Sequence, residues 1–440
     1  MNRAQKLLAN LAFLGAASSA FSATVIHITG STAYRSQTNT AILKSFDNGT
    51  TVKVGSTNAA LGSSAVSYFH GTMGGVDTII ETKFTGSVGG IKAVTSGALL
   101  EFLADDTDTR GGNFSTVNIV ASSSPTVPSF GSTVGANGLC QTPGGTNPSV
   151  NSVAAEVAMS DTFQDATQYR SPTLTGAVIP GAPPAKVGVV PFVWIRTPSA
   201  AANVSALNNM NPTLANLLYG NGTLPLAMWS GLASDESYLV YGAGRDPDSG
   251  TRLSTFAESG RGANATVRQY HPLTEDTTAT SISQAGSITS VEVFPTTTVA
   301  NLGQTFINGN AGESSGGTLA GYMAKGFATA NPGALVAYSG TGDASGAIQK
   351  GAQILAWNGV SLATQPALGT TPAFDFNLIR NGKYTFWSYE HMLYLSGISA
   401  DKKTVANKIA TQIYTTDAQI LISSMRVDRA GDGAQVTPVY

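Results

Sequence analysis

The stretch VIHITGSTA, residues 25–33, decides the fold, because a short apolar run typical of a β-strand passes directly into a Gly-Ser-Thr turn. Beyond this turn, apolar side chains recur at loosely helical spacing, at Tyr34, Ala41, Ile42 and Phe46. The pattern therefore predicts a strand, a tight turn and a helix in immediate succession.

The same order recurs in the stretch TIIETKFTGSVGG, residues 78–90. The apolar run predicts a strand, and the Gly-Ser turn after it opens a second helix. Ile91, Val94, Ala98 and Phe102 follow three or four residues apart, so we expect them on one face of that helix. The chain thus repeats its first unit.

A third unit is predicted in YLVYGAGRDPDSGT, residues 238–251, where a strand is followed by a polar turn. The helix after it carries Leu253, Phe256 and Ala257. Arg245 lies six residues before Thr251, so this turn also has a fixed positive charge.

Each of the three turns is a candidate anion site. The first turn of a helix presents unpaired backbone N–H groups and the positive end of the helix dipole. Glycine lets the backbone approach a ligand, and Ser and Thr add hydroxyl donors. Three such turns that converge on one point would enclose an oxyanion such as phosphate.

Strands and helices alternate along the remaining chain, so the predicted class is α/β. We expect strands in residues 154–161, 187–195 and 333–338, the second of them as a buried strand pair, and helices in 214–219, 227–232 and 405–413. Residues 105–148 are rich in Ser, Gly, Pro and Thr, which predicts an irregular surface insertion.

Composition narrows the class of partner. The 440 residues have a formal net charge of −2 and only 11% of them are charged, so the chain lacks the basic stripe that a nucleic-acid surface needs. Cys140 is the only cysteine, which excludes an internal disulfide. The four histidines are scattered without metal-ligand spacing, and no activated nucleophile stands out. We therefore expect no metal, no cofactor and no catalytic group.

The N-terminus has the pattern of a signal peptide. Arg3 and Lys6 precede an apolar run over residues 7–17, and small residues follow at Ala20 and Ser22. We expect residues 1–22 to be removed by cleavage near Ser22 and Ala23. No later stretch approaches the ~20 apolar residues of a membrane span, so the mature chain is expected to be soluble, periplasmic or secreted, without stable membrane insertion.

Four segments, in this order, resemble the periplasmic phosphate-binding proteins of ABC transporters, which belong to the type II periplasmic-binding-protein superfamily. The segments are Gly30-Ser31-Thr32, Gly86-Ser87-Val88-Gly89-Gly90-Ile91-Lys92, Ala158-Met159-Ser160-Asp161 and Arg245-Asp246-Pro247-Asp248-Ser249-Gly250-Thr251. The resemblance implies a two-lobed α/β fold with a ligand cleft between the lobes. The partners that it implies are inorganic phosphate and the subunits of an ABC permease, for a monomeric protein that is not an enzyme.

The expected division places residues 23–195 and 338–440 in lobe I, with a loop insertion at about 105–150, and residues 196–337 in lobe II. Position by position, the resemblance implies a phosphate site formed by Ser31, Thr32, Ala33, Ser87, Asp161, Arg245, Ser249, Gly250 and Thr251. In that site Arg245 pairs with the anion, Ser249 to Thr251 cap it from the second lobe, and Asp161 is the acceptor.

The chemistry of Asp161 supports this role independently of the family. A carboxylate accepts a hydrogen bond from a proton that phosphate still carries, whereas fully ionised sulfate meets it only with repulsion. Two positions depart from the family pattern. Pro247 stands where the family often has an Asp that orients the arginine, so either Asp246 or Asp248 could take that role, and Val88 replaces a frequent Ser.

Two alternatives come from other classes of protein. An extracellular phosphatase could hold a phosphate monoester in the same cleft, although the chain shows no catalytic grouping for it. A non-transport surface protein could reuse the fold, as the low charge and the Thr-, Gly- and Asn-rich insertion suggest. Turnover of a chromogenic phosphate ester would favour the first, and surface assembly without phosphate binding the second.

Overall fold

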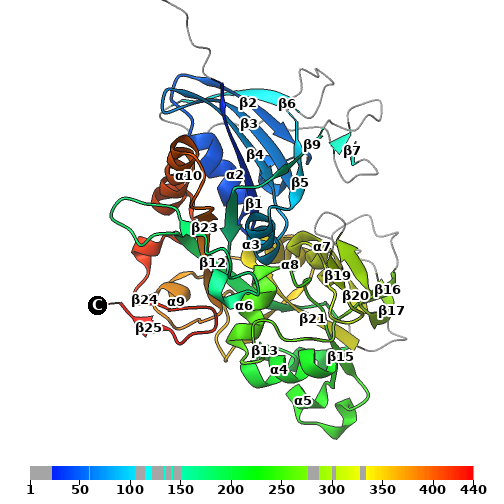
Figure 1. Cartoon of the computed structure of the whole chain (residues 1–440). Coiled ribbons are helices and arrows are strands. Elements are labelled where there is room, and N and C mark those ends of the chain that lie inside the picture. The colour runs from blue at the N-terminus through cyan, green and yellow to red at the C-terminus, as the bar shows by residue number, and fades with distance from the viewer. Residues whose placement is uncertain are drawn as a thin grey trace, which may run out of the picture.

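The computed structural model is a mixed α/β protein whose strands continue through two lobes (Figure 1). The residues that it describes are 22–58, 60–104, 114–120, 133–134, 140–141, 150–199, 201–275, 287–299, 304–327 and 333–439. The predicted signal peptide lies outside this part of the chain, except for Ser22. Among the described helices, none is long and apolar enough to span a membrane.

One lobe is built on the first two predicted units. Its sheet runs β6-β2-β3-β4-β1-β10, with β1 parallel to both neighbours. The strands are β1 (Thr24–Gly30), β2 (Thr51–Ser56), β3 (Val66–Met73), β4 (Val76–Lys83), β6 (Phe114–Asn118) and β10 (Val157–Ser160). The helices are α2 (Arg35–Lys44), α3 (Ser87–Ser96) and α10 (Ala400–Gln412), and α10 lies beside α2 (Figure 1). Short pairs are formed by β5 (Leu99–Leu103) with β9 (Val150–Ala154), and by β7 (Thr133–Val134) with β8 (Cys140–Gln141).

The other lobe surrounds the third unit. Its strands are β13 (Asn209–Met210), β14 (Thr223–Pro225), β15 (Leu239–Gly242), β21 (Gly333–Gly340) and β22 (Gln353–Trp357), and its helices are α4 (Pro212–Asn221), α5 (Ala227–Ser230), α6 (Gly250–Glu258), α7 (Gly316–Met323) and α8 (Thr341–Gln349). The short helix α9 (Asn377–Arg380) contacts the C-terminal segment, where the Arg380 carbonyl accepts the Arg426 N–H (2.9 Å). Smaller sheets contain β16 (Tyr270–Glu275), β17 (Ser287–Val293) and β20 (Gly326–Phe327), and β18 (Thr297–Val299) with β19 (Gln304–Phe306).

Two long strands join the lobes. β12 (Lys186–Arg196) pairs through its first part with β23 (Trp387–Tyr394) and through its second part with β21 and β22. β23 pairs in turn with β10 and with β11 (Thr175–Gly176) in the first lobe. The chain ends in the hairpin of β24 (Val427–Asp428) and β25 (Thr437–Pro438). The two-lobed α/β class predicted from the sequence is therefore the observed one.

An aromatic cluster supports the second lobe at this crossover. Trp194 on β12 stacks on Trp357 and on Phe386, with ring centroids 5.9 and 5.5 Å apart, and meets Tyr338 edge-on. All four side chains are buried. Rings of this size bury most apolar area per residue, so the cluster fixes the second half of β12. Trp387 is likewise buried.

Three local predictions were wrong. Ala98 and Phe102 do not continue the second helix, because Gly97 takes a left-handed conformation at its end and Phe102 lies on β5. The strand pair expected over residues 187–195 is one continuous strand, β12. Residues 114–118, within the predicted irregular insertion, form β6 and pair with β2. Most of the remaining insertion lies outside the described residues.

The pairing of β22 bears on the predicted lobe boundaries. β22 pairs with β12 and β13, and α8 packs on α7, so residues 341–357 lie with the second lobe although 338–440 was assigned to the first. Return to the first lobe occurs through β23. The boundaries themselves stay a prediction.

We predict opposite effects for two glycine substitutions. Gly30 has φ +115°, and a Cβ there would lie 1.9 Å from the Met159 carbonyl oxygen, so Gly30→Ala should cost at least about 3 kcal/mol of unfolding free energy. Gly346, in the exposed middle of α8, has open space at Cβ, so Gly346→Ala should gain roughly 0.5–1 kcal/mol. Urea unfolding of both variants tests this, and equal stabilities would contradict it.

Candidate functional site

Three turns of the first lobe, those after β1, β4 and β10, meet the turn before α6 of the second lobe. β10, β1 and β4 are adjacent parallel strands, so the turns after them lie at the same edge of the sheet. These turns lead into α2 and α3 and into Asp161. Glycines permit the close approach, because a Cβ at Gly90 would lie 2.5 Å from the Gly30 Cα, and one at Gly86 would lie 2.5 Å from the Asp248 carbonyl oxygen.

Asp161 is the centre of the first group of predicted residues. Its carboxylate is buried and accepts hydrogen bonds from the Ser87 hydroxyl (2.5 Å) and the Thr251 hydroxyl (3.0 Å). A Cβ at Gly250 would lie 1.8 Å from Asp161 Oδ1, so only glycine fits there. Burial raises the pKa of Asp161, and the hydroxyl donors oppose this effect. Ser87 and Thr251 belong to different lobes, so Asp161 links them.

The N-termini of α3 and α6 face this carboxylate. Ser249 is the N-cap of α6, where its side-chain oxygen accepts a hydrogen bond from the Arg252 N–H (3.2 Å). Gly250 and Thr251 form the first turn of α6, and Ser87 opens α3. The positive ends of two helix dipoles therefore point to one buried position.

Arg245 and Thr32 form the second group. The buried Arg245 donates through Nη2 to the Thr32 hydroxyl (3.1 Å) and so connects the two lobes again. Its guanidinium also donates to the carbonyl oxygens of Glu313 (2.9 Å) and Ser314 (2.9 Å). Within the described chain these carbonyls orient Arg245, and neither candidate carboxylate hydrogen-bonds its guanidinium. Asp246 instead accepts the Asp248 N–H (3.1 Å).

Ser31 and Ala33 face elsewhere. The Ser31 hydroxyl donates to Glu390 on β23 (3.1 Å), and the Ser31 N–H donates to the Met159 carbonyl (2.8 Å). Ala33 lies near the start of α8, with its Cβ 3.7 Å from where a Cβ of Gly340 would lie. The structure therefore brings Ser87, Asp161, Gly250 and Thr251 together, places Thr32 with Arg245, and turns Ser31 to the crossover strand.

A polar groove of about 640 Å³ adjoins the second group. Thr32 lines the groove and also accepts the hydrogen bond from Arg245, so the groove leads to Arg245. Arg35 and Lys83 give it positive charge from the first lobe, and Asp246 and Asp248 give it carboxylates from the second. The full lining is Thr32, Arg35, Asn58, Ser63, Ala65, Lys83, Phe84, Thr85, Asp246, Asp248, Ser314, Ser315, Gly317 and Thr318.

Buried carboxyls outnumber the arginines around this site. Burial raises the pKa of Asp246 to about 6, that of Asp248 to about 7 and that of Glu313 to about 7, and Arg245 opposes the shifts at Asp246 and Glu313. Burial also holds the pKa of Glu390 well above its usual range, with the nearby Asp161 acting in the same direction. The site thus combines hydroxyl and guanidinium donors with carboxyls that are protonated or ionised according to pH.

Sequence reasoning missed Arg252, Glu313 and Glu390. Arg252 directly follows the third turn, and its guanidinium bonds to the carbonyls of Arg245 (3.0 Å) and Asn310 (2.8 Å), so its place in the helix could have indicated it. Glu313 and Glu390 have no local signal. Within the described chain, no group of three or more His, Cys, Asp or Glu side chains could hold a metal ion.

The raised pKa of Glu313 predicts a pH-dependent gain from Glu313→Gln. The unfolded chain ionises near pH 4.5 and the folded chain near 7, so the wild type loses stability as pH rises between these values. The Gln variant lacks this loss and should be more stable than wild type by roughly 2 kcal/mol at pH 8 and equal to it at pH 4.5. Urea unfolding at both pH values is the measurement, with the exposed Glu236→Gln as control. A difference that does not change with pH would contradict the assignment.

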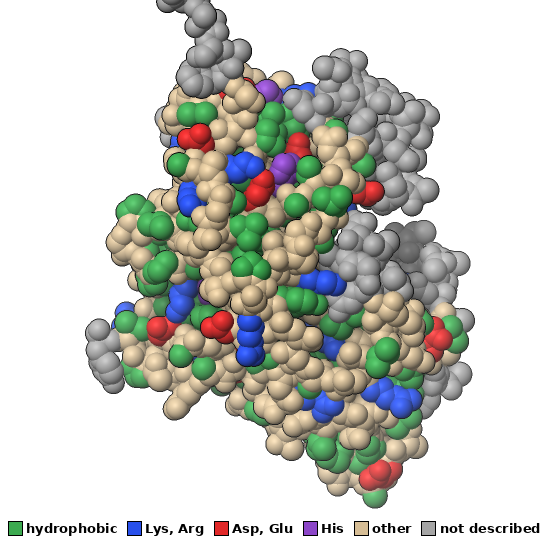
Figure 2. Space-filling model, viewed as in Figure 1, with side chains coloured by type: hydrophobic (Ala, Val, Ile, Leu, Met, Phe, Trp, Pro, Cys, Tyr) green, Lys and Arg blue, Asp and Glu red, His purple; other side chains and the backbone are tan. Residues whose placement is uncertain are grey.

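Figure 2 shows charged side chains scattered among apolar and polar ones on the face in view, without an extended basic stripe.

No family model matches the chain, and a search of curated proteins finds no match. Among solved structures, it is similar to a protein from Clostridium perfringens with bound phosphate, assigned as a phosphate ABC transporter substrate-binding protein, at 10% identity and a TM-score of 0.40, over 91% of this chain and 100% of that one. It is also similar to an ABC-type phosphate transport receptor from Vibrio cholerae, at 10% identity and a TM-score of 0.39, over 88% of this chain and 93% of that one. These values are too low to assign a ligand to this chain.

Proposed function

We propose that this chain is an exported binding protein that captures inorganic phosphate between its lobes and delivers it to an ABC permease. The observation that carries the proposal is the buried Asp161 carboxylate at the N-termini of α3 and α6, held by hydroxyls from both lobes. A site of this kind offers donors to the oxygens of an anion and one acceptor for its remaining proton.

In the structure these donors bond to other side chains of the site. Ser87 and Thr251 both bond to Asp161, and Arg245 bonds to Thr32. In the proposed complex these hydroxyls and the guanidinium turn to phosphate oxygens. Their bonds to phosphate then replace the bonds to Asp161 and Thr32. Arg245 would exchange a bond to a neutral hydroxyl for a stronger one in which both donor and acceptor are charged, and Asp161 would exchange the hydroxyl donors for the proton that phosphate carries.

The remaining predicted residues have supporting roles in the proposal. Ser249, Gly250 and Thr251 supply the amides of the first turn of α6, while Ser31, Thr32 and Ala33 supply the turn before α2. The lobes are joined through β12 and β23, so separation by bending of these two strands would admit the ligand. Binding and release need no covalent step, in keeping with a protein that is not an enzyme.

The similar solved structures from Clostridium perfringens and Vibrio cholerae are described as a phosphate transporter substrate-binding protein and a phosphate transport receptor. Delivery to a permease, a periplasmic or secreted location after cleavage near Ser22, and a monomeric state belong to the same proposal. They follow from the N-terminal sequence pattern and the resemblance of the four site segments.

Calorimetric titration with phosphate and then with sulfate tests the function. Wild type, stripped of carried-over ligand by unfolding and refolding, should bind phosphate and not sulfate. Arg245→Ala should weaken phosphate binding roughly 100-fold, because it removes a buried charge partner of the anion. The exposed Lys350→Ala controls for net charge and should bind as wild type does. No heat with either anion, or equal binding by wild type and Arg245→Ala, would refute the proposal or the site.

The role of Asp161 has its own test. Asp161→Asn should lower the preference for phosphate over sulfate by about 10-fold or more, because an amide no longer repels an unprotonated oxyanion. The exposed Asp401→Asn is the matched control. Competition of sulfate against bound phosphate measures the ratio, and an unchanged ratio would remove Asp161 from the selectivity role.

A further inference from the structure

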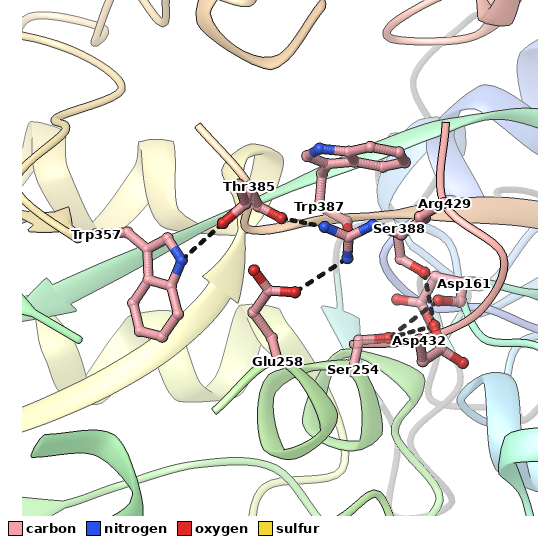
Figure 3. A network of polar contacts seen from close by, with 9 residues as sticks. All are labelled: Asp161, Ser254, Glu258, Trp357, Thr385, Trp387, Ser388, Arg429 and Asp432. Atoms are coloured by element: carbon pink, nitrogen blue, oxygen red, sulfur yellow. Dashed lines mark hydrogen bonds and ion pairs between the residues drawn. The ribbon is translucent and has the colours of Figure 1, made fainter. Parts of the chain in front are cut away.

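The C-terminal hairpin, with the turn at its tip, lies against three elements that carry the proposed site. We call residues 427–438 the C-terminal clasp. Figure 3 shows two of its side chains, Arg429 and Asp432, between α6 of the second lobe and the crossover strand β23, with Asp161 beside them. This segment was not recognised in the sequence, where it shows no motif.

Arg429 ties the clasp to the far end of α6. Its Nη1 lies 3.1 Å from the Glu258 carboxylate and 2.8 Å from the Trp387 carbonyl oxygen, and its Nη2 donates to the Thr385 carbonyl (2.6 Å). The guanidinium also lies over the Trp387 ring, 4.3 Å from its centroid. Arg429 is only 2% exposed, so this is a desolvated charge held by fixed partners.

Asp432 connects the clasp to both lobes at once. One carboxylate oxygen accepts from the Ser254 hydroxyl on α6 (3.2 Å) and from the Ser388 hydroxyl on β23 (2.9 Å), and the other accepts the Phe163 N–H (2.9 Å). Burial raises the pKa of Asp432 to about 6, with Asp161 adding to the shift, whereas the hydrogen bonds from the Phe163 N–H and the Ser388 hydroxyl oppose it.

The contacts of Asp432 extend to the site itself. Phe163 lies two residues after Asp161, and the Ser254 hydroxyl is 3.3 Å from the Asp161 carbonyl oxygen. Ser254 lies one helical turn beyond Gly250 and Thr251 on α6. Next to Asp432, a Cβ at Gly433 would lie 2.5 Å from the Ala257 backbone, so the tip of the clasp sits directly on the helix.

We propose that Arg429 and Asp432 are positioning residues of the anion site, because they hold α6 against the turn that carries Asp161 and so keep Gly250 and Thr251 in place. The clasp holds α6 at two points, at its last residue, Glu258, through Arg429 and at its middle, Ser254, through Asp432. Separation of the lobes then requires the clasp to release α6, so the clasp slows the exit of a bound anion. The role in ligand exit rests on the proposed function, whereas the hold on α6 does not.

Hydrogen exchange in the ligand-free protein tests the hold on α6. Asp432→Ala should reduce the protection of the amides of α6 from Leu253 onward, which are hydrogen-bonded within the helix, by about 10-fold or more while β1 and β4 keep theirs, because local opening lowers protection only where contacts are lost. Asp417→Ala removes a comparable acidic contact, to Lys44 on α2 of the first lobe, and should leave these amides unchanged. Unchanged protection of α6, or an equal loss throughout the protein, would overturn the proposal.

Conservative variants separate positioning from general damage. Arg429→Lys keeps a charge beside Glu258 but loses bonds to the two carbonyls, so it should fold and show a smaller loss of α6 protection than Arg429→Ala. Asp432→Asn keeps an acceptor for the two hydroxyls but can leave the Phe163 N–H unpaired, so it should lie between wild type and Asp432→Ala. Equal protection in the conservative and alanine variants would also overturn the proposal.

Phosphate release is the second measurement. In stopped-flow displacement by excess phosphate of another isotope or label, Asp432→Ala should release phosphate about 10-fold faster with little change in the association rate. An unchanged release rate would overturn the link to ligand exit. If the wild type binds no phosphate, the proposed function fails, and the exchange measurement still decides whether the clasp positions α6.

Discussion

The bond between Asp161 and its two hydroxyl partners is the interaction on which the site depends. Ser87 comes from the first lobe and Thr251 from the second, so a single carboxylate joins the two halves of the molecule at their meeting point. Gly250 is required there because any side chain would occupy the position of the carboxylate oxygen. Because Gly250 has no side chain, α6 can lie directly against Asp161. This placement brings the lobes together, and it buries the Asp161 carboxylate between them.

The balance of charge around this point depends on protons. Arg245 and Arg252 lie among Asp246, Asp248 and Glu313, and burial shifts the pKa of each of these three carboxyls upward. Neutral carboxyls leave the arginines free to attract an anion, whereas ionised ones compete with it. The same groups that give the site its acceptors therefore also tie its charge to pH.

The parts of the site that could be predicted from the sequence are those with local causes. A strand that runs into a Gly-Ser turn and a helix needs only neighbouring residues, and α2, α3 and α6 begin where that pattern placed them. Ser31 was placed at the correct turn, but its direction was not predictable, because its partner Glu390 lies 359 residues away. Arg429 and Glu258 are separated from each other by 171 residues, so no local pattern marks this pair.

The ends of helices and strands were likewise predictable only where their causes are local in the sequence. Gly97 ended α3 earlier than the apolar spacing indicated, and Phe102 joined a strand because β9, about fifty residues later, pairs with it. The long run of apolar residues in β12 indicated burial correctly, yet its continuity comes from β21, β22 and β23, all of which follow it by well over one hundred residues. Tertiary pairing decided what spacing alone left open.

The position of β23 in the sheet has a consequence for how the molecule is made. This strand lies between β10 and β12, although it comes from residues 387–394 of a 440-residue chain. The middle of the main sheet is therefore the last part to be filled, and the two lobes cannot be joined until nearly the whole polypeptide has been synthesised. Sheet order thus delays completion of the fold.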